Sequence, residues 1–134
     1  NMGYAARGAA DEIEQLFQPG AWLVGTIACP EGGHYQVKMF IASNEDAVVI
    51  GQINYDIHFN SRNGGSGIFA TTGFTGSIDP LANTVQIEHT KLLKQTQRPG
   101  FKIQLPGKWN AKWNGKTLED GSGKRLFTFQ KEKL

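Results

Sequence analysis

Hydrophobic and polar residues alternate without interruption along residues 107–118, Gly-Lys-Trp-Asn-Ala-Lys-Trp-Asn-Gly-Lys-Thr-Leu. Successive side chains of a β-strand point to opposite sides of the sheet. The alternation therefore predicts one strand with a buried face and a solvated face. The buried face is predicted to carry Trp109, Ala111, Trp113 and Thr117, and the solvated face Lys108, Asn110, Lys112, Asn114 and Lys116.

The same two-residue period recurs along much of the chain from residue 21 onward. Clusters of glycine, proline, asparagine and aspartate separate the alternating segments, as expected for tight turns between consecutive strands. Within one segment, Gly73 and Gly76 indicate a β-bulge or a tight bend. The pattern predicts strands at residues 21–29, 34–42, 47–59, 67–79, 84–93, 101–105, 107–118 and 124–131.

Residues 9–18 have a different period and predict a short helix. Ile13, Leu16 and Phe17 fall on one face at helical spacing, and Pro19-Gly20 ends the segment. A helix of this length is marginally stable on its own, so its apolar stripe is expected to dock on other elements. Closing one end of the domain is the expected role, and linking it to a preceding domain is the alternative.

About eight short strands with one apolar face predict an all-β fold. An antiparallel up-and-down barrel with a short N-terminal helix is favoured, because closing the sheet on itself removes its edges. A β-sandwich is the alternative. The 134 residues are expected to form one folded domain. Residues 20–134 are assigned to the barrel, and residues 1–19 to a leading segment that is a linker or vector-derived sequence.

The motif Gly20-x-Trp22 at the start of the first strand, and Lys124-Arg125 at the start of the last, resemble the calycin group of barrels, which includes lipocalin-like and avidin-like proteins. This resemblance implies a barrel that holds one small ligand. It also implies that Trp22 lies at the closed end of the barrel beneath a basic residue, here Arg125. The lipocalin disulfide cannot form, because Cys29 is the one cysteine. The avidin residues that hold biotin have no match.

Charge is distributed unevenly along a chain whose net charge is +2. Residues 1–67 contain three Lys/Arg and seven Asp/Glu, a net charge of −4, whereas residues 68–134 contain eleven and five, a net charge of +6. Neighbouring strands of the second half are therefore expected to form a basic face that includes Lys108, Lys112 and Lys116. Such a face either keeps the surface solvated or binds an anionic partner.

Cysteine usage and hydropathy exclude several classes of protein. One cysteine permits no internal disulfide, which favours a reducing compartment and hence the cytoplasm. No Cys/His spacing indicates a metal site, and no apolar run approaches the ~20 residues of a membrane span. The first residues also lack the layout of a signal peptide. We expect neither a metal nor a cofactor.

Two glycine-rich segments resemble phosphate-binding loops only superficially. Gly115-Lys116-Thr117 lacks the first glycine of a P-loop, and Gly65-Ser66-Gly67 is followed by residues typical of a strand rather than a helix. No catalytic residues are assigned, because neither a carboxylate pair nor a nucleophile motif is present. Nucleic-acid binding is not expected, because Trp109 and Trp113 face away from the neighbouring lysines, whereas stacked bases need both on one surface.

The function expected from these patterns is non-catalytic binding of a small, largely apolar molecule inside the barrel. A filled barrel that serves as a protein-interaction or accessory domain of a larger protein is the alternative, and a lipocalin-like enzyme is a third hypothesis. His89 shares the inward face with Val85 and Ile87 and is the polar residue expected to orient the ligand. The residues expected to line the site are Trp22, Tyr35, Tyr55, His89, Trp109 and Trp113.

Overall fold

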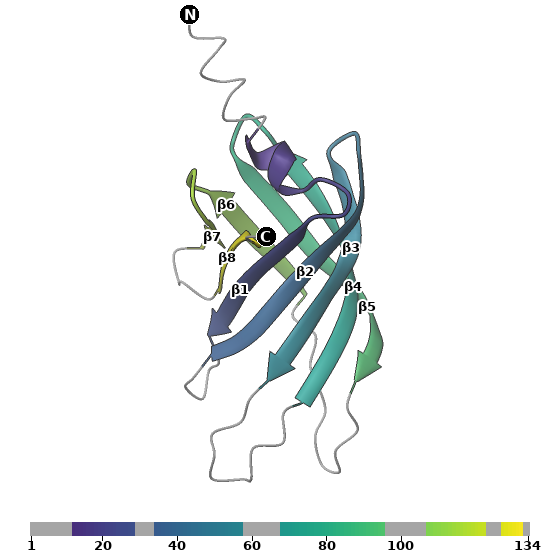
Figure 1. The fold of residues 1–134 in the computed structure, drawn as a ribbon. Helices are drawn as coiled ribbons and strands as arrows, with labels where there is room; N and C mark the ends of the chain where they lie inside the picture. Colours follow the sequence, from purple (N-terminus) through teal and green to yellow (C-terminus); the bar gives the residue numbers. More distant parts are fainter. Residues whose placement is uncertain (1–11, 29–33, 58–67, 96–106, 123–126, 133–134) are drawn as a thin grey trace, which may run out of the picture.

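A computed structural model describes residues 12–28, 34–57, 68–95, 107–122 and 127–132. Its eight antiparallel strands follow one another in sequence order, and the last pairs with the first to close a barrel (Figure 1). The predicted up-and-down barrel is therefore confirmed, and the sandwich alternative is wrong. The strands are β1 (Trp22–Ala28), β2 (His34–Glu45), β3 (Val48–Ile57), β4 (Ile68–Asp79), β5 (Thr84–Gln95), β6 (Lys108–Trp113), β7 (Leu118–Asp120) and β8 (Phe127–Lys131).

Alternating positions of the strands point into the barrel and form a continuous apolar core. On β6, Trp109 and Ala111 are buried, whereas Lys108, Asn110 and Lys112 are exposed. The alternation seen in the sequence therefore separates the inside from the outside. Fully buried members of this core include Leu23, Met39, Ile41, Val49, Ile53, Ile87, Leu118 and Phe129.

The single strand predicted at residues 107–118 is in fact two strands joined by a tight turn. Asn114 Oδ1 accepts hydrogen bonds from the backbone N–H groups of Lys116 and Thr117, each at 2.8 Å. Gly115 has a φ of 95°, which side chains rarely tolerate. Thr117 is therefore half-buried in the turn rather than on the inward face of a strand. The strand predicted at residues 101–105 lies outside the described residues.

The bend predicted in the fourth strand is confirmed. The pairing of β4 with β5 shifts register between Thr71 and Thr72 and again between Thr72 and Phe74, and the second shift spans Gly73. A second irregularity lies between Ile41 and Ser43 in the pairing of β2 with β3. Such shifts increase the local bend of a strand, which helps the sheet to close into a barrel.

Residues 12–16 form the helical turn that was expected from the sequence, and it covers one end of the barrel (Figure 1). Ile13, Leu16 and Phe17 are buried as part of the barrel core. Two side-chain hydrogen bonds hold the segment in place. Trp113 Nε1 donates to Glu12 Oε2 at 3.2 Å, and Asn44 Nδ2 donates to the Phe17 carbonyl at 3.1 Å.

Two inward-facing glycines allow neighbouring strands to approach closely. A Cβ atom at Gly25 would collide with the backbone of Thr128, and one at Gly51 would collide with the Phe40 carbonyl and the ring of Phe74. The clash at each position involves backbone atoms, which cannot move away without breaking the sheet. Both glycines are therefore required by the packing of the barrel.

We predict that Gly51→Ala destabilises the fold by about 3 kcal/mol or more, because the added methyl group overpacks the interior. Urea denaturation followed by circular dichroism measures the change. Gly107→Ala is the matched control, since no atom lies within 4 Å of the position that its Cβ would occupy. Equal loss of stability in the two variants would contradict this account of Gly51.

The turn between β2 and β3 places two non-glycine residues in the left-handed region. Asp46 has a φ of 53° and Ala47 a φ of 64°, as in the two-residue turns that favour glycine. Aspartate tolerates this conformation, whereas alanine is strained there by about 1 kcal/mol. The strained backbone of Ala47 therefore lowers the free energy of unfolding, and a glycine at this position would relieve the strain.

We predict that Ala47→Gly raises the free energy of unfolding by about 1 kcal/mol, because it relieves this strain. Ala82→Gly in the exposed turn between β4 and β5 is the matched control, since Ala82 is not among the residues with positive φ. That control is expected to lose stability, because glycine gains chain entropy on unfolding. A loss in both variants would show that Ala47 is unstrained.

Candidate functional site

A hydrogen-bonded pair of polar side chains, Tyr55 of β3 and His89 of β5, lies inside the barrel. Both follow the inward alternation of their strands, and 7% of Tyr55 and 9% of His89 remain exposed. The Tyr55 hydroxyl contacts His89 Nε2 in a short, buried hydrogen bond. Because an unpaired polar group is costly in an apolar interior, each side chain depends on the other for its burial.

Backbone contacts determine which imidazole nitrogen carries the proton. The Gly107 carbonyl lies 3.4 Å from His89 Nδ1 and also accepts the backbone N–H of His89 at 3.2 Å. A carbonyl can only accept, so Nδ1 carries the proton and Nε2 is left as the acceptor. The Tyr55 hydroxyl therefore donates to His89, and its oxygen retains the capacity to accept a further hydrogen bond.

The hydroxyl of Thr72 adds a third polar atom beside this pair. Thr72 is fully buried on β4, and its Oγ1 makes no hydrogen bond of normal geometry with any described residue. It nevertheless lies beside the Tyr55 phenol, where burial raises the pKa of Tyr55 and the Thr72 hydroxyl opposes that rise in part. A buried hydroxyl without a good partner is rare in proteins and indicates capacity for a further hydrogen bond.

Aromatic rings surround the polar pair. Trp109 meets the His89 ring edge to face at a centroid distance of 4.5 Å and stacks on Phe127 at 5.0 Å. It also approaches the Tyr55 ring edge-on at 6.4 Å. The resulting wall is apolar apart from the Tyr55, His89 and Thr72 polar atoms. This combination is typical of pockets that hold an apolar molecule by a few oriented polar contacts.

The cluster lies towards the end of the barrel opposite the helix. Tyr55 is near the end of β3, whereas Trp109 and Phe127 are near the starts of β6 and β8 (Figure 1). Tyr55, His89 and Trp109 each retain 7–9% exposure, whereas Ile53 and Ile87, their inward neighbours along β3 and β5, are completely buried. The polar pair therefore marks the boundary of the core on this side.

Burial holds both members of the pair in their neutral forms. It raises the pKa of the Tyr55 phenol far above its usual value. Burial also lowers the pKa of His89, an effect that the hydrogen bond to the Gly107 carbonyl opposes in part. At neutral pH the site therefore offers an uncharged hydroxyl and an uncharged imidazole.

The predicted site residues occupy three different places in the fold. Tyr55, His89 and Trp109 lie together in the interior. Trp113 lies at the helix end, where its indole N–H reaches Glu12. The side chain of Tyr35 and all of Arg125 lie outside what the structure describes.

Trp22 lies on the outer face, which corrects the interior position expected from the resemblance to calycins. Its neighbour Leu23 is the completely buried residue, and the Trp22 ring packs on Phe40 at a centroid distance of 4.9 Å. The Gly-x-Trp motif therefore does not place its tryptophan inside this barrel. Strand alternation places Leu23 there instead.

Sequence reasoning missed two members of the cluster, Thr72 and Phe127. Phe127 was recognisable, because it alternates with exposed Thr128 and shares the inward face with Phe129. Thr72 gave no such signal, because the register shifts beside Gly73 interrupt the alternation of β4. Its position depends on the bulge, which only the folded sheet reveals.

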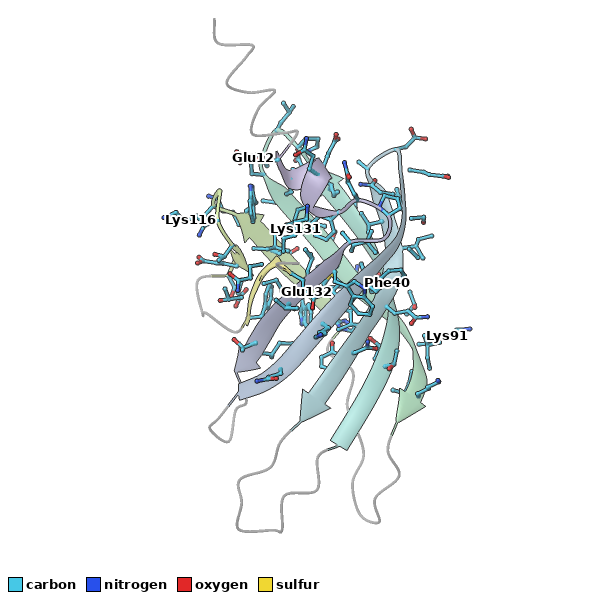
Figure 2. The ribbon with its side chains drawn as sticks, viewed as in Figure 1. Glu12, Phe40, Lys91, Lys116, Lys131 and Glu132 are labelled. Atoms are coloured by element: carbon cyan, nitrogen blue, oxygen red, sulfur yellow. The ribbon has the colours of Figure 1, made fainter. Side chains whose placement is uncertain are left out.

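Two of the three lysines of the predicted basic face lie opposite carboxylates on neighbouring strands. Lys108 is opposite Glu88 of β5, and Lys112 is opposite Glu119 of β7. Lys116 lies in the turn that follows β6 and is exposed (Figure 2). Positive charge on this side is therefore partly balanced by neighbouring negative charge.

Comparison with known proteins leaves the calycin resemblance at the level of the barrel architecture. No family model matches the chain, and neither a curated protein nor a solved structure is significantly similar to it. Within the described ranges, no group of three or more His, Cys, Asp and Glu residues is arranged to hold a metal ion. Over the same residues, no helix has the length and hydropathy needed to span a bilayer.

We predict that stability falls as the pH drops below about 6.5, the ordinary histidine pKa. The pKa of His89 is lower in the folded protein than in the unfolded chain. The unfolded chain therefore takes up a proton first, and the stability contributed by neutral His89 is lost between the unfolded and folded pKa values. Urea denaturation from about pH 8 to about pH 5 measures this loss.

His89→Gln is the control for the pH experiment, because glutamine offers amide hydrogen bonds but does not titrate. The variant is expected to be less stable at every pH and to show a shallower dependence of stability on pH. An unchanged pH dependence in His89→Gln would attribute the effect to other groups.

Proposed function

We propose that this barrel binds a small, largely apolar molecule that carries one uncharged polar group. The ligand enters at the end opposite the helix and lies against the aromatic wall of Trp109 and Phe127. The observation that supports this most directly is the buried Tyr55–His89 pair, with the unsatisfied Thr72 hydroxyl beside it. These atoms offer oriented hydrogen bonds in otherwise apolar surroundings.

The neutrality of the pair argues for an uncharged ligand group. A carboxylate or an ammonium ion at this position would lose its hydration without gaining an opposite charge. An alcohol, a ketone or an ester can accept a hydrogen bond from the Thr72 hydroxyl, and an alcohol can also donate one to the Tyr55 oxygen. The pKa shifts also disfavour proton transfer between Tyr55 and His89, so the arrangement supports binding rather than acid–base catalysis.

A filled barrel that acts as an interaction or accessory domain is the second candidate. It is favoured by the continuous packing of Ile13, Phe17 and the strand residues into one core near the helix. The exposed side chains of Val48 and Ile50 on the outer face of β3 also provide apolar surface for a partner. The two candidates differ in whether the interior takes up a small molecule.

Nile red tests the proposal, because it is an uncharged apolar dye with a carbonyl group and its emission shifts to the blue in apolar surroundings. We predict saturable, blue-shifted emission on titration into the purified protein, and at least about fivefold weaker binding in Thr72→Val, which removes the hydroxyl that is free to donate to the dye carbonyl. Native mass spectrometry of protein purified from its own host looks for a co-purified apolar molecule in parallel.

Trp22→Ala is the matched control, because this tryptophan lies on the outer face. Dye binding is expected to be unchanged in Trp22→Ala and reduced in Trp109→Phe, with far-UV circular dichroism confirming that each variant folds. Absence of both saturable dye binding and a co-purified molecule would overturn the proposal and leave the filled barrel. Equal binding by wild type, Thr72→Val and Trp109→Phe would place the dye outside this site.

A further inference from the structure

The outer face of the barrel carries a hollow of about 590 Å³ that the interior site does not explain. It extends over the outward side chains of β8, β1, β2, β3 and β4. Its lining includes Val24 and four residues at inward-facing positions, Gly25, Val37, Tyr55 and Ala70. Residues that line it with hydrogen-bonding side chains on the outer face are Thr26, Gln36, Lys38, Asn54, Thr71 and Gln130.

Most of the hydrogen-bonding side chains that line this outer hollow are uncharged. Three side-chain amides, Gln36, Asn54 and Gln130, come from three different strands. Thr71 Oγ1 donates a hydrogen bond to Asn54 Oδ1 at 2.9 Å. This contact fixes the orientation of the Asn54 amide so that its NH₂ group, a donor of two hydrogen bonds, is directed away from Thr71.

An aromatic pair lies next to Val24 and Lys38 at one side of the hollow. Trp22 and Phe40 are each two residues along a strand from a lining residue and share the outward face with it, a separation of about 7 Å. Their rings pack at a centroid distance of 4.9 Å, and both side chains are half-buried. Figure 2 shows Phe40 on the outward side of the front strands, on the same side as Glu132.

The one charged lining residue among those described is already engaged. Lys38 Nζ lies 3.4 Å from Glu132 Oε1, so its positive charge is partly balanced. A phosphate or another strong anion therefore finds little uncompensated charge in the hollow. An extended peptide that adds to a sheet edge is also disfavoured, because each described strand already has a neighbour on both sides.

We infer that the outer hollow is a second binding site, specific for a neutral oligosaccharide. Planar amides and hydroxyl groups match the vicinal hydroxyl groups of a sugar, which both donate and accept hydrogen bonds. An exposed aromatic face packs against the apolar C–H face of a pyranose ring. This assignment is independent of the interior site, because its polar contacts come from side chains on the opposite face of the sheet.

The test uses four neutral hexasaccharides built from glucose, xylose, mannose and N-acetylglucosamine, each titrated into ¹⁵N-labelled protein. We predict that at least one binds saturably with a dissociation constant of about 1 mM or tighter. The resonances expected to shift are the side-chain amides of Gln36, Asn54 and Gln130 and the indole N–H of Trp22. Gln36→Ala and Asn54→Ala are each expected to weaken binding at least about tenfold, with unchanged thermal midpoints.

Gln86→Ala is the matched control, since Gln86 is an exposed amide on the outer face of β5, away from the lining residues. This variant should bind like the wild type, and Trp22→Phe should bind more tightly than Trp22→Ala. The inference is overturned if none of the four sugars produces a saturable shift. It is equally overturned if the shifts map to other strands, or if Gln86→Ala weakens binding as much as Gln36→Ala.

Discussion

Closure of the sheet by the pairing of β1 with β8 is the constraint on which the rest of this structure depends. Leu23 is opposite Lys131 and Ile27 is opposite Phe127, so residues about a hundred positions apart become neighbours. Closure gives every described strand a neighbour on both sides and a defined inner face. It requires close approach at Gly25, where the backbone of β8 occupies the space of a side chain.

Enclosure changes the chemistry of the polar side chains that the alternation directs inward. In water Tyr55 and His89 would be ordinary titrating groups. Inside the barrel they lose hydration, are held in their neutral forms and satisfy one another, with the Gly107 carbonyl fixing the tautomer. The same burial that costs free energy gives the pair a defined orientation, which is the property that a specific binding site needs.

Side chains on the outer face remain exposed to water and keep their hydration. Charged residues there lie opposite one another across the strands, as Lys108 does with Glu88, and these pairs contribute little to stability. The outer hollow instead gathers amides and hydroxyl groups next to Trp22 and Phe40. The two faces of one sheet therefore offer distinct chemistries, an aromatic interior with a buried polar pair and a hydrated exterior that carries charged pairs and uncharged amides.

The sequence by itself determined the buried face of β2, β3, β5 and β6, because uninterrupted period-two alternation is local and follows from strand geometry. It thereby predicted the barrel, the docked helix and the inward positions of His89 and Trp109. Tertiary structure decided where strands end, where a strand bulges and which distant strands pair, because alternation along one segment carries no information on these points. The turn at Asn114 divided one predicted strand into two, the bulge beside Gly73 set the position of Thr72, and the pairing of distant strands brought His89 to Tyr55. These outcomes depend on register and closure, which are properties of pairs of strands and not of any one segment.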